Sequence, residues 1–353
     1  MRTIAAVFIA VSVAGACAAQ SDALLAPLPI RDQFLLNNSF FFFVPEQAAV
    51  LPRDHTVVAL TMTDSNTFAK SAWLTRSLEG QTTRTTAPDE LANPRFHSGA
   101  PVFLVDGEAR RIELSVRHGF GRHLELGVAV PVSTMGGGWS DELIEVTHHT
   151  LGIGNDERDS LTRNLETIYL QSGKLLYVRE RSDGFALGDI AVTGKYELVQ
   201  LEGHDVAISL SGAVELPTGN ARTIAGSGSL DAGLEVIASR DFSNMRIHAS
   251  VGLLRLGSNH PLGTPAQVLI TDTVAISRKI NARTAATVQL TVSESPLRRL
   301  GIAEFNRRSN QLSAGIRREI GRSLIVYAAL IENLFNYENS ADAGIAWGLL
   351  KQF

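Results

Sequence analysis

Residues 123–132 read HLELGVAVPV and show the pattern that decides the fold. Every second position is apolar, namely Leu124, Leu126, Val128, Val130 and Val132. The intervening positions are mostly polar or small, beginning with His123, Glu125 and Gly127. Successive side chains of a β-strand point to opposite faces of a sheet. This period of two therefore predicts a strand with one apolar face.

The same alternation recurs along the chain. It predicts twelve strands, near 56–65, 108–118, 123–132, 187–199, 205–216, 228–239, 245–256, 266–278, 282–293, 309–317, 323–332 and 342–353. Most runs are about 10 residues long, enough for a tilted strand to cross a bilayer, whereas strands of soluble domains average about five or six. Short turns alternate with long connections. We therefore predict an all-β, antiparallel transmembrane barrel of about twelve strands, with both ends of the mature chain at the periplasmic rim.

Two loop segments add detail to this barrel. Residues 164–181 contain two short, poorly alternating stretches, which either form a hairpin above the membrane or raise the strand count to fourteen; we prefer twelve. Residues 140–152 lie in the longest loop, which is expected to be extracellular, and predict a short helix. Ser140 is the expected N-cap, Asp141 and Glu142 lie in the first turn, and Gly152 is the expected stop.

The N-terminus resembles a secretory signal. Arg2 precedes an apolar run over residues 4–16, followed by small residues around Cys17. We predict a signal peptide over 1–19, an N-terminal arm or plug over 20–52 and the barrel over 53–353. The run Phe40–Phe43 within the arm is expected to form an extra strand or an interface segment. Lipidation of Cys17, the single cysteine, is the alternative to simple cleavage.

Composition and motifs argue against several classes of function. The net charge is −4, and no basic block indicates nucleic-acid binding. His148 and His149 are adjacent, and adjacent helical side chains point about 100° apart, so a shared metal ion is not expected. No nucleophile elbow, P-loop or dinucleotide fingerprint is present in the sequence. We predict neither enzymatic activity nor a cofactor.

Several short motifs occur in an order that resembles a known family. They are PLPIRDQ at Pro27–Gln33, Gly188-Asp189, LPTG at Leu216–Gly219, ENLF at Glu332–Phe335, and the loop helix around Ile144–Leu151. In this order they resemble the Gram-negative outer-membrane proteins grouped as domain of unknown function 3187. The resemblance spans most of the mature chain and implies an outer-membrane barrel. It brings no known substrate or catalytic residues. The LPTG motif is also similar to barrels proposed to pass aromatic compounds.

The polar face of the predicted strands carries charges of both signs. If the apolar face meets lipid, ten charged residues line the lumen: Arg111, Glu113, Arg117, Glu125, Lys195, Glu197, Asp231, Glu235, Arg246 and Arg317. Two interpretations remain open. Opposite charges on neighbouring strands pair and stiffen a narrow barrel, or the charges form a polar path that selects solutes. We prefer the first interpretation.

The final strand carries a further signal. Ile345, Trp347, Leu349 and Phe353 share one face, which we expect to be the lipid-facing one. A terminal Phe on such a strand resembles the signal by which the barrel assembly machinery selects its substrates. Lys351 departs from that pattern, but a lysine at the periplasmic rim can extend its amine to the headgroups. We therefore predict the bacterial outer membrane as the location, with its lipids and the assembly machinery as partners.

Three hypotheses for function follow. The first is a channel or transporter for small solutes. The second is a structural or partner-binding barrel that presents loops 66–107 and 133–186 without transport. The third is a soluble secreted β-sandwich.

Overall fold

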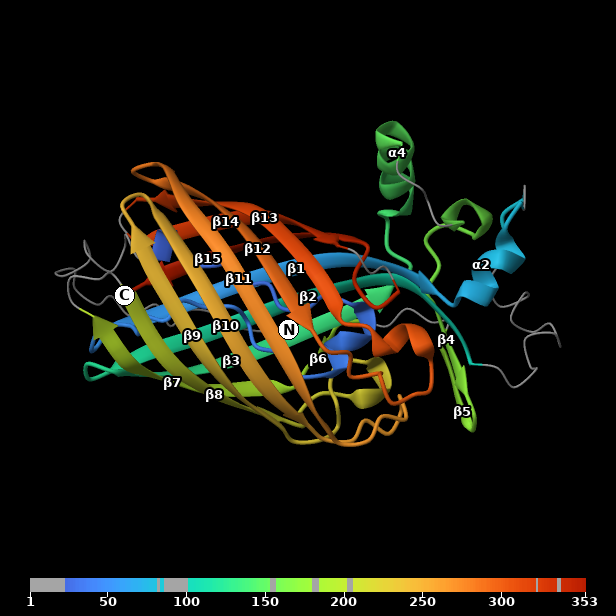
Figure 1. Ribbon diagram of the computed structural model, residues 1–353, viewed down its shortest axis with the longest axis horizontal. Coiled ribbons are helices and arrows are strands. Elements are labelled where there is room, and N and C mark those ends of the chain that lie inside the picture. The colour runs from blue at the N-terminus through green and yellow to red at the C-terminus, as the bar shows by residue number, and fades with distance from the viewer. Residues whose placement is uncertain are drawn as a thin grey trace, which may run out of the picture.

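The computed structural model describes residues 23–80, 83–85, 101–152, 157–179, 184–201, 206–321, 323–334 and 338–353. Within these ranges, twelve long strands form the wall of a closed barrel (Figure 1). They are β1 (Thr56–Lys70), β2 (Val102–Phe120), β3 (Leu124–Gly136), β7 (Ile190–Leu201), β8 (Val206–Leu216), β9 (Asp231–Phe242), β10 (Met245–Leu256), β11 (Gln267–Asn281), β12 (Thr284–Ser293), β13 (Ser309–Ile320), β14 (Leu324–Asn333) and β15 (Ala343–Gln352). The predicted signal peptide over 1–19, Cys17, and Phe335 of the ENLF motif lie outside the described residues.

The barrel closes because its first and last strands pair. Each wall strand is antiparallel to its neighbours, and β1 pairs with β2 on one side and β15 on the other. Thr61, for example, lies opposite Gly348 of β15 and Glu113 of β2. Closure satisfies the backbone N–H and C=O groups of the wall without leaving a free sheet edge. The predicted barrel of twelve strands is thereby confirmed.

The two ends of the barrel differ. Short turns join β2 to β3, β9 to β10, β11 to β12 and β13 to β14 at the end marked C in Figure 1, which we call the turn end. The opposite end, here called the loop end, carries the longer connections. Helix α4 (Asp141–Leu151) lies there and confirms the predicted loop helix. Helix α2 (Ala72–Leu78), also at the loop end, was not predicted.

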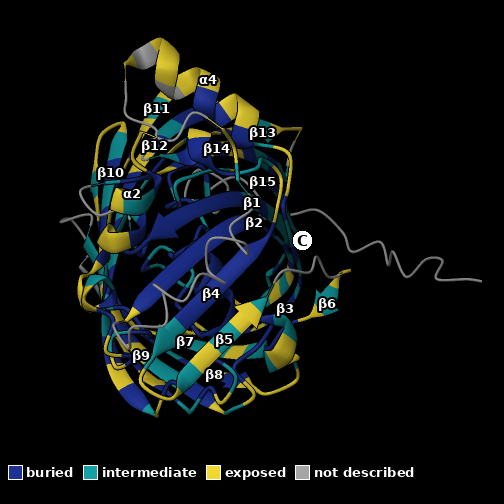
Figure 2. Ribbon diagram, turned by 90° about the vertical axis from the view of Figure 1, so that its right-hand side faces the viewer, coloured by how far each residue is buried: buried dark blue, intermediate teal, exposed yellow. Residues whose placement is uncertain are grey.

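The 164–181 stretch forms a hairpin outside the twelve-stranded wall. Strands β4 (Thr167–Ser172) and β5 (Leu175–Arg179) pair with each other, and β4 pairs with the beginning of β2 over Val102–Asp106. The hairpin therefore adds two strands to the sheet only beside the loop-end part of β2, outside the closed wall. At this end β1, β2 and β4 are largely buried (Figure 2). A two-residue strand, β6 (Ala186–Leu187), pairs with β3 beside the start of β7.

The outer face of the wall is apolar. Leu114, Val288 and Leu330 are among the outward residues, with 48%, 54% and 67% of their surface exposed. Their sequence neighbours, such as Glu113 and Gln289, turn inward and are buried. An apolar outer band around a polar interior is the arrangement of a β-barrel that stands in lipid. Among the described residues, no helix is long and apolar enough to span a membrane.

Residues 23–52 lie inside the barrel and are mostly buried. We call them the N-terminal segment. Its first described residues, Ala23 and Leu24, are helical, and Leu35–Ser39 form a short 3-10 helix, η1. The rest is irregular and does not join the sheet. The run Phe40–Phe43 is buried in the interior. The expectation of an extra strand or an interface segment at this run was therefore wrong.

Candidate functional site

The N-terminal segment first ascends the lumen along β10 to β15 and β1. Near the turn end, the Leu25 carbonyl oxygen lies 2.8 Å from Nε2 of His248 on β10. Near the loop end, Gln311 of β13 holds the segment at two points: its Nε2 donates to the Arg31 carbonyl at 3.1 Å, and its Oε1 accepts from the Gln33 N–H at 2.9 Å. Polar backbone groups of the segment thus find partners among inward-facing wall side chains.

The segment turns at η1, close to the loop end. Arg31 closes this turn, because its Nη2 donates to the carbonyl oxygens of Asn37 at 2.6 Å and Phe40 at 2.5 Å. Asp32 Oδ1 accepts from the Phe34 N–H at 3.0 Å and from Asn37 Nδ2 at 2.8 Å. The PLPIRDQ motif therefore builds the ascending part of the segment and the start of its turn.

The descending part returns along β9, β8, β7 and β3. The Ala48 N–H donates to Oγ of Ser239 on β9 at 3.0 Å, and the Leu51 N–H donates to Oε2 of Glu125 on β3 at 2.9 Å. The chain then enters β1 at Thr56, at the turn end. Both passes of the N-terminal segment therefore cross the interior from one rim towards the other, and the segment occupies much of the lumen.

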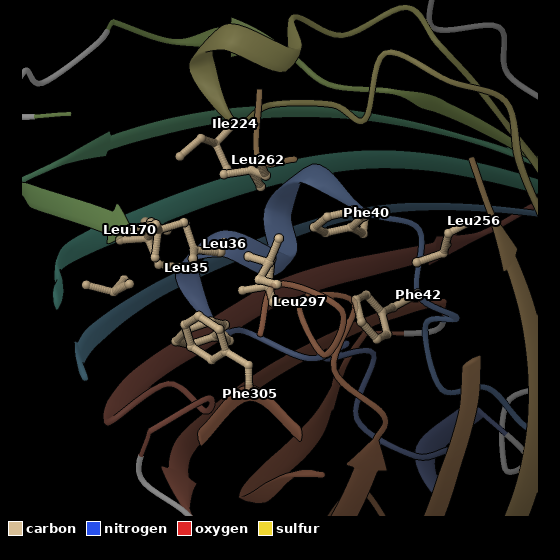
Figure 3. Close-up of a cluster of buried hydrophobic side chains, with 14 of the residues drawn as sticks. Leu35, Leu36, Phe40, Phe42, Leu170, Ile224, Leu256, Leu262, Leu297 and Phe305 are labelled. Carbon is tan, nitrogen blue, oxygen red and sulfur yellow. The ribbon is translucent and has the colours of Figure 1, made fainter. Parts of the chain in front are cut away.

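Apolar contacts close the lumen where the segment turns (Figure 3). Side chains of η1 and Phe40 meet side chains from four connections of the loop end, and all are buried. We call this set the mouth cluster; it comprises Leu35, Leu36, Phe40, Leu170, Ile224, Leu262, Leu297 and Phe305. Because its members come from both the N-terminal segment and the loops, the cluster couples the position of the segment to the position of the loops.

The structure places the ten charged residues proposed to line the lumen on the inward face of the wall. Nine of them are buried, and Arg117 is half-buried. Five of them form cation–carboxylate contacts with one another: Arg111 with Glu113, and both Arg117 and Lys195 with Glu125. Arg111 Nη2 lies 2.8 Å from Glu113 Oε2 on the same strand, and Arg117 Nη1 lies 3.1 Å from Glu125 Oε1 on the next strand.

The remaining members are held in different ways. Glu197 lies 3.5 Å from Nδ1 of His123, Asp231 accepts from the Gly257 N–H at 2.7 Å, and Arg246 donates to Asp241 at 2.7 Å. Glu235 Oε2 and two nitrogens of Arg317 have no hydrogen-bond partner among the described residues. These charges therefore do not form one continuous network.

Glu46, on the descending part of the segment, joins three wall strands and was not identified from the sequence. Its carboxylate lies 2.8 Å from Lys195 Nζ, 3.2 Å from Arg117 Nη1 and 3.3 Å from Ser211 Oγ. Glu125 completes the cluster, 3.6 Å from Lys195. A lone glutamate in an irregular segment gives no periodic signal, and only the fold brings it to its partners.

A cavity of about 170 Å³ remains between the N-terminal segment and the wall. Its lining combines apolar groups such as Pro29, Ile325 and Leu350 with charged groups such as Arg111, Glu215 and Arg317. An ordered water needs about 10–15 Å³ of volume measured in this way. The cavity is therefore an order of magnitude larger than a single water site and can hold a small solute.

The Gly188-Asp189 and LPTG motifs meet at the loop end. Asp189 Oδ1 accepts from the Gly219 N–H at 2.6 Å, and Oδ2 accepts from the Ser227 N–H at 2.7 Å. Thr218 Oγ1 donates to the Gly188 carbonyl at 3.0 Å. Both motifs thus fix the connections between β6 and β7 and between β8 and β9, which gives them a structural role.

The last strand closes the barrel. Phe353 and Thr56 exchange two backbone hydrogen bonds, of 2.9 and 3.2 Å. Ile345, Trp347 and Phe353 lie on the exposed outer face, and Leu349 is partly exposed on the same side. Lys351 donates to Ser323 Oγ, with its Nζ 5.8 Å from the Phe353 ring centroid. The lysine amine therefore lies at the rim of the barrel, beside the end of the last strand.

The part of the chain that the structure describes contains no group of three or more His, Cys, Asp or Glu side chains arranged to hold a metal ion. His149 lies 3.3 Å from Asp159 on an exposed part of the loop end.

The closed sheet, its apolar outer face and its polar interior define a transmembrane β-barrel. The chain belongs to the family described as protein of unknown function (DUF3187), whose pattern matches residues 11–353. The resemblance noted from the short motifs is thereby confirmed. No curated protein matches the sequence.

Solved outer-membrane barrels share this architecture. The chain is similar to the COG4313 outer membrane channel from Pseudomonas putida F1, with a TM-score of 0.53 and 10% identity over 87% of this chain and 98% of that one. It also matches the KdgM porin (TM-score 0.41, 7% identity, 84% and 99% covered). A third match is the Ralstonia pickettii toluene transporter TbuX (TM-score 0.39, 10% identity, 87% and 92% covered). The likeness to the channel from Pseudomonas putida F1 shows that the chain has the fold of a Gram-negative outer-membrane β-barrel.

Proposed function

We propose that the protein is a passive channel for small solutes, held closed by the N-terminal segment and the mouth cluster. The observation that carries this proposal is the cavity between the segment and the charged wall. A barrel built only for rigidity gains from a filled interior, since close packing maximises contacts between atoms. Here the interior instead keeps room beside a segment that the wall holds by hydrogen bonds as well as by apolar contacts.

The polar contacts between the N-terminal segment and the wall lower the free-energy cost of moving the segment. Hydrogen bonds from Ala48 and Leu51 to the wall can be exchanged for hydrogen bonds to water. The bond from Ala48 to the Ser239 hydroxyl therefore contributes only about 0.5–1.5 kcal/mol net, and the bond from Leu51 to the Glu125 carboxylate about 1.5–3 kcal/mol. At the extracellular end, the apolar mouth cluster opposes displacement of the segment more strongly than these hydrogen bonds do. Passage of a solute then requires the segment and the loops to separate at that cluster.

A reversible disulfide lock tests this proposal. The chain's single native cysteine is Cys17, within the predicted signal peptide, so two introduced cysteines can pair without competition in the mature chain. Ala48 and Ser239 are suitable positions, because the Ala48 nitrogen lies 3.0 Å from Ser239 Oγ. In planar lipid bilayers we expect the reduced double variant A48C/S239C to conduct in steps, and the oxidised variant to be silent.

Two controls complete this experiment. Each single cysteine variant should conduct under both redox conditions, and a chain lacking residues 23–52 should show larger conductance than the full chain. Silence of the wild-type and of the shortened chain alike, with both folded by heat-modifiable gel migration, would contradict the channel.

A second function, partner binding through the extracellular loops, is favoured by one surface. Trp139, Leu143 and Val146 are more than half exposed, at 54%, 56% and 55%, and occupy one side of α4 and its approach. Asp141 and Glu145, on the opposite side of the helix, are buried against the loops. If the barrel serves a partner, L143E/V146E should abolish binding to intact cells while the barrel stays folded and its conductance stays unchanged.

A further inference from the structure

Arg317 of β13 is a buried cation without a carboxylate partner. It is 1% exposed, and its Nη2 donates to the Pro27 carbonyl of the N-terminal segment. Its Nε and Nη1, which carry three of the five guanidinium N–H donors, have no acceptor among the described residues. Its other close contact is the Tyr327 ring, whose centroid lies 5.5 Å from the guanidinium carbon.

Four other buried cations in the described structure have carboxylate partners, namely Arg111, Arg158, Lys195 and Arg246. Arg111 is 2.8 Å from Glu113, Lys195 is 2.8 Å from Glu46, and at the loop end Arg158 is 2.7 Å from Asp141. Burying a charge without a partner is costly, and proteins normally avoid it by pairing. The exception at Arg317 therefore indicates a partner that the chain itself does not supply.

Arg31 also lines the cavity without an ion pair within the described chain, but its position differs. Its guanidinium donates to the Asn37 and Phe40 carbonyls and thereby closes the turn of the segment. Arg317 closes no such turn. It belongs to the barrel wall, is among the residues that line the cavity of about 170 Å³, and keeps two buried nitrogens without an acceptor among the described residues.

The surroundings of Arg317 indicate the kind of anion. The cavity lining includes Pro27, whose carbonyl accepts from Arg317, together with Pro29, Ile325 and Leu350. These groups are apolar and cannot solvate a strongly hydrated inorganic ion. We infer that Arg317 and this lining form a binding site for a small organic carboxylate with a compact apolar body, its carboxylate on the guanidinium and its body against the prolines and aliphatic side chains.

This site specifies the class of solute for the proposed channel, and its biological role therefore rests on that proposed function. The binding itself can be tested separately. Benzoate serves as the probe and benzamide as its neutral isostere, each titrated calorimetrically into the purified full chain. We expect benzoate to bind and benzamide to bind at least about tenfold more weakly, because only the anion neutralises Arg317.

Variants assign the binding to Arg317. R317Q should weaken benzoate binding at least about tenfold, and R317K, which keeps the charge but loses the planar donors, should fall between R317Q and wild-type. R240Q is the matched control, because Arg240 is exposed on the outer face and its loss changes the net charge equally. It should leave binding unchanged. If R317Q does not fold, the comparison of benzoate with benzamide and the R317K variant still decide the outcome.

The outcomes separate the site from the channel. Equal affinity of benzoate for wild-type and R317Q, or equal binding of benzoate and benzamide, would overturn the site even if wild-type conducts. Arg317-dependent benzoate binding in a protein that shows no conductance supports the site and removes the channel. Acetate that binds as tightly as benzoate would overturn the apolar part of the assignment.

Discussion

Neutralising Glu46 should loosen the descending part of the N-terminal segment without unfolding the barrel. In E46Q the side chain keeps its size and one carbonyl oxygen but loses its charge. The lost contacts are those with Lys195 at 2.8 Å and Arg117 at 3.2 Å. Both cations keep a carboxylate in Glu125, at 3.6 and 3.1 Å respectively, so neither becomes an uncompensated buried charge.

The size of the effect follows from these contacts. A hydrogen bond to a charged group contributes about 1.5–3 kcal/mol net, and the remaining Glu125 places the cost of E46Q within that range rather than above it. Since about 1.4 kcal/mol corresponds to a factor of ten, the detached state of the descending part should become about ten- to a hundredfold more populated.

Hydrogen exchange followed by mass spectrometry measures this population directly. Peptides covering residues 41–52 should exchange about ten- to a hundredfold faster in E46Q, while peptides from β9 to β12 stay unchanged. D54N is the matched control, because the Asp54 side chain is 80% exposed near the end of the same stretch. Exchange in E46Q that equals exchange in D54N would refute the role assigned to Glu46.

Three further predictions concern assembly, packing and pH. Deleting Phe353 should lower the amount of folded protein in outer membranes, measured by heat-modifiable migration; wild-type levels would contradict the assembly role. In G233V the added Cβ would lie 2.7–2.9 Å from two phenylalanine rings of the N-terminal segment, so exchange there should increase. Burial raises the pKa of Glu145, but hydrogen bonds from Arg163 and Arg84 outweigh burial and lower it below the usual value. The docking of α4 is therefore intact above about pH 4.3 and weakens as the pH falls further, which exchange across α4 measures.

The wall of the barrel could be predicted because its signal is local. In β3 the alternation between Leu124 and Val132 fixes which side chains face lipid, and closure needs only that each strand pairs with the next. The helix α4 was likewise predicted from neighbouring residues, a cap and an acidic first turn. Helix α2 is shorter and has no acidic residue in its first turn, so its residues carry no comparable indication of a helix.

The path of the N-terminal segment could not be predicted because its contacts are not local. Gln33 and Gln311 are 278 positions apart, and Lys195 and Glu46 are 149 positions apart. No period links such pairs, and the segment makes little regular structure beyond η1. Its prolines and the phenylalanine run indicated an unusual segment, but only the folded barrel shows which wall residues hold it.

The N-terminal segment also changes how the wall charges are interpreted. Pairing between neighbouring strands, as in Arg117 with Glu125, is part of the arrangement, but Glu46 supplies a carboxylate that the wall lacks. Over residues 23–52 the segment carries Arg31, Asp32 and Glu46, a net charge of −1. Its departure would leave the lumen more positive by one unit, so opening the lumen would favour anions. A chain lacking residues 23–52 should therefore be more anion-selective than the full-length chain in its conducting state. Equal reversal potentials for the two in a salt gradient would contradict this coupling between opening and charge.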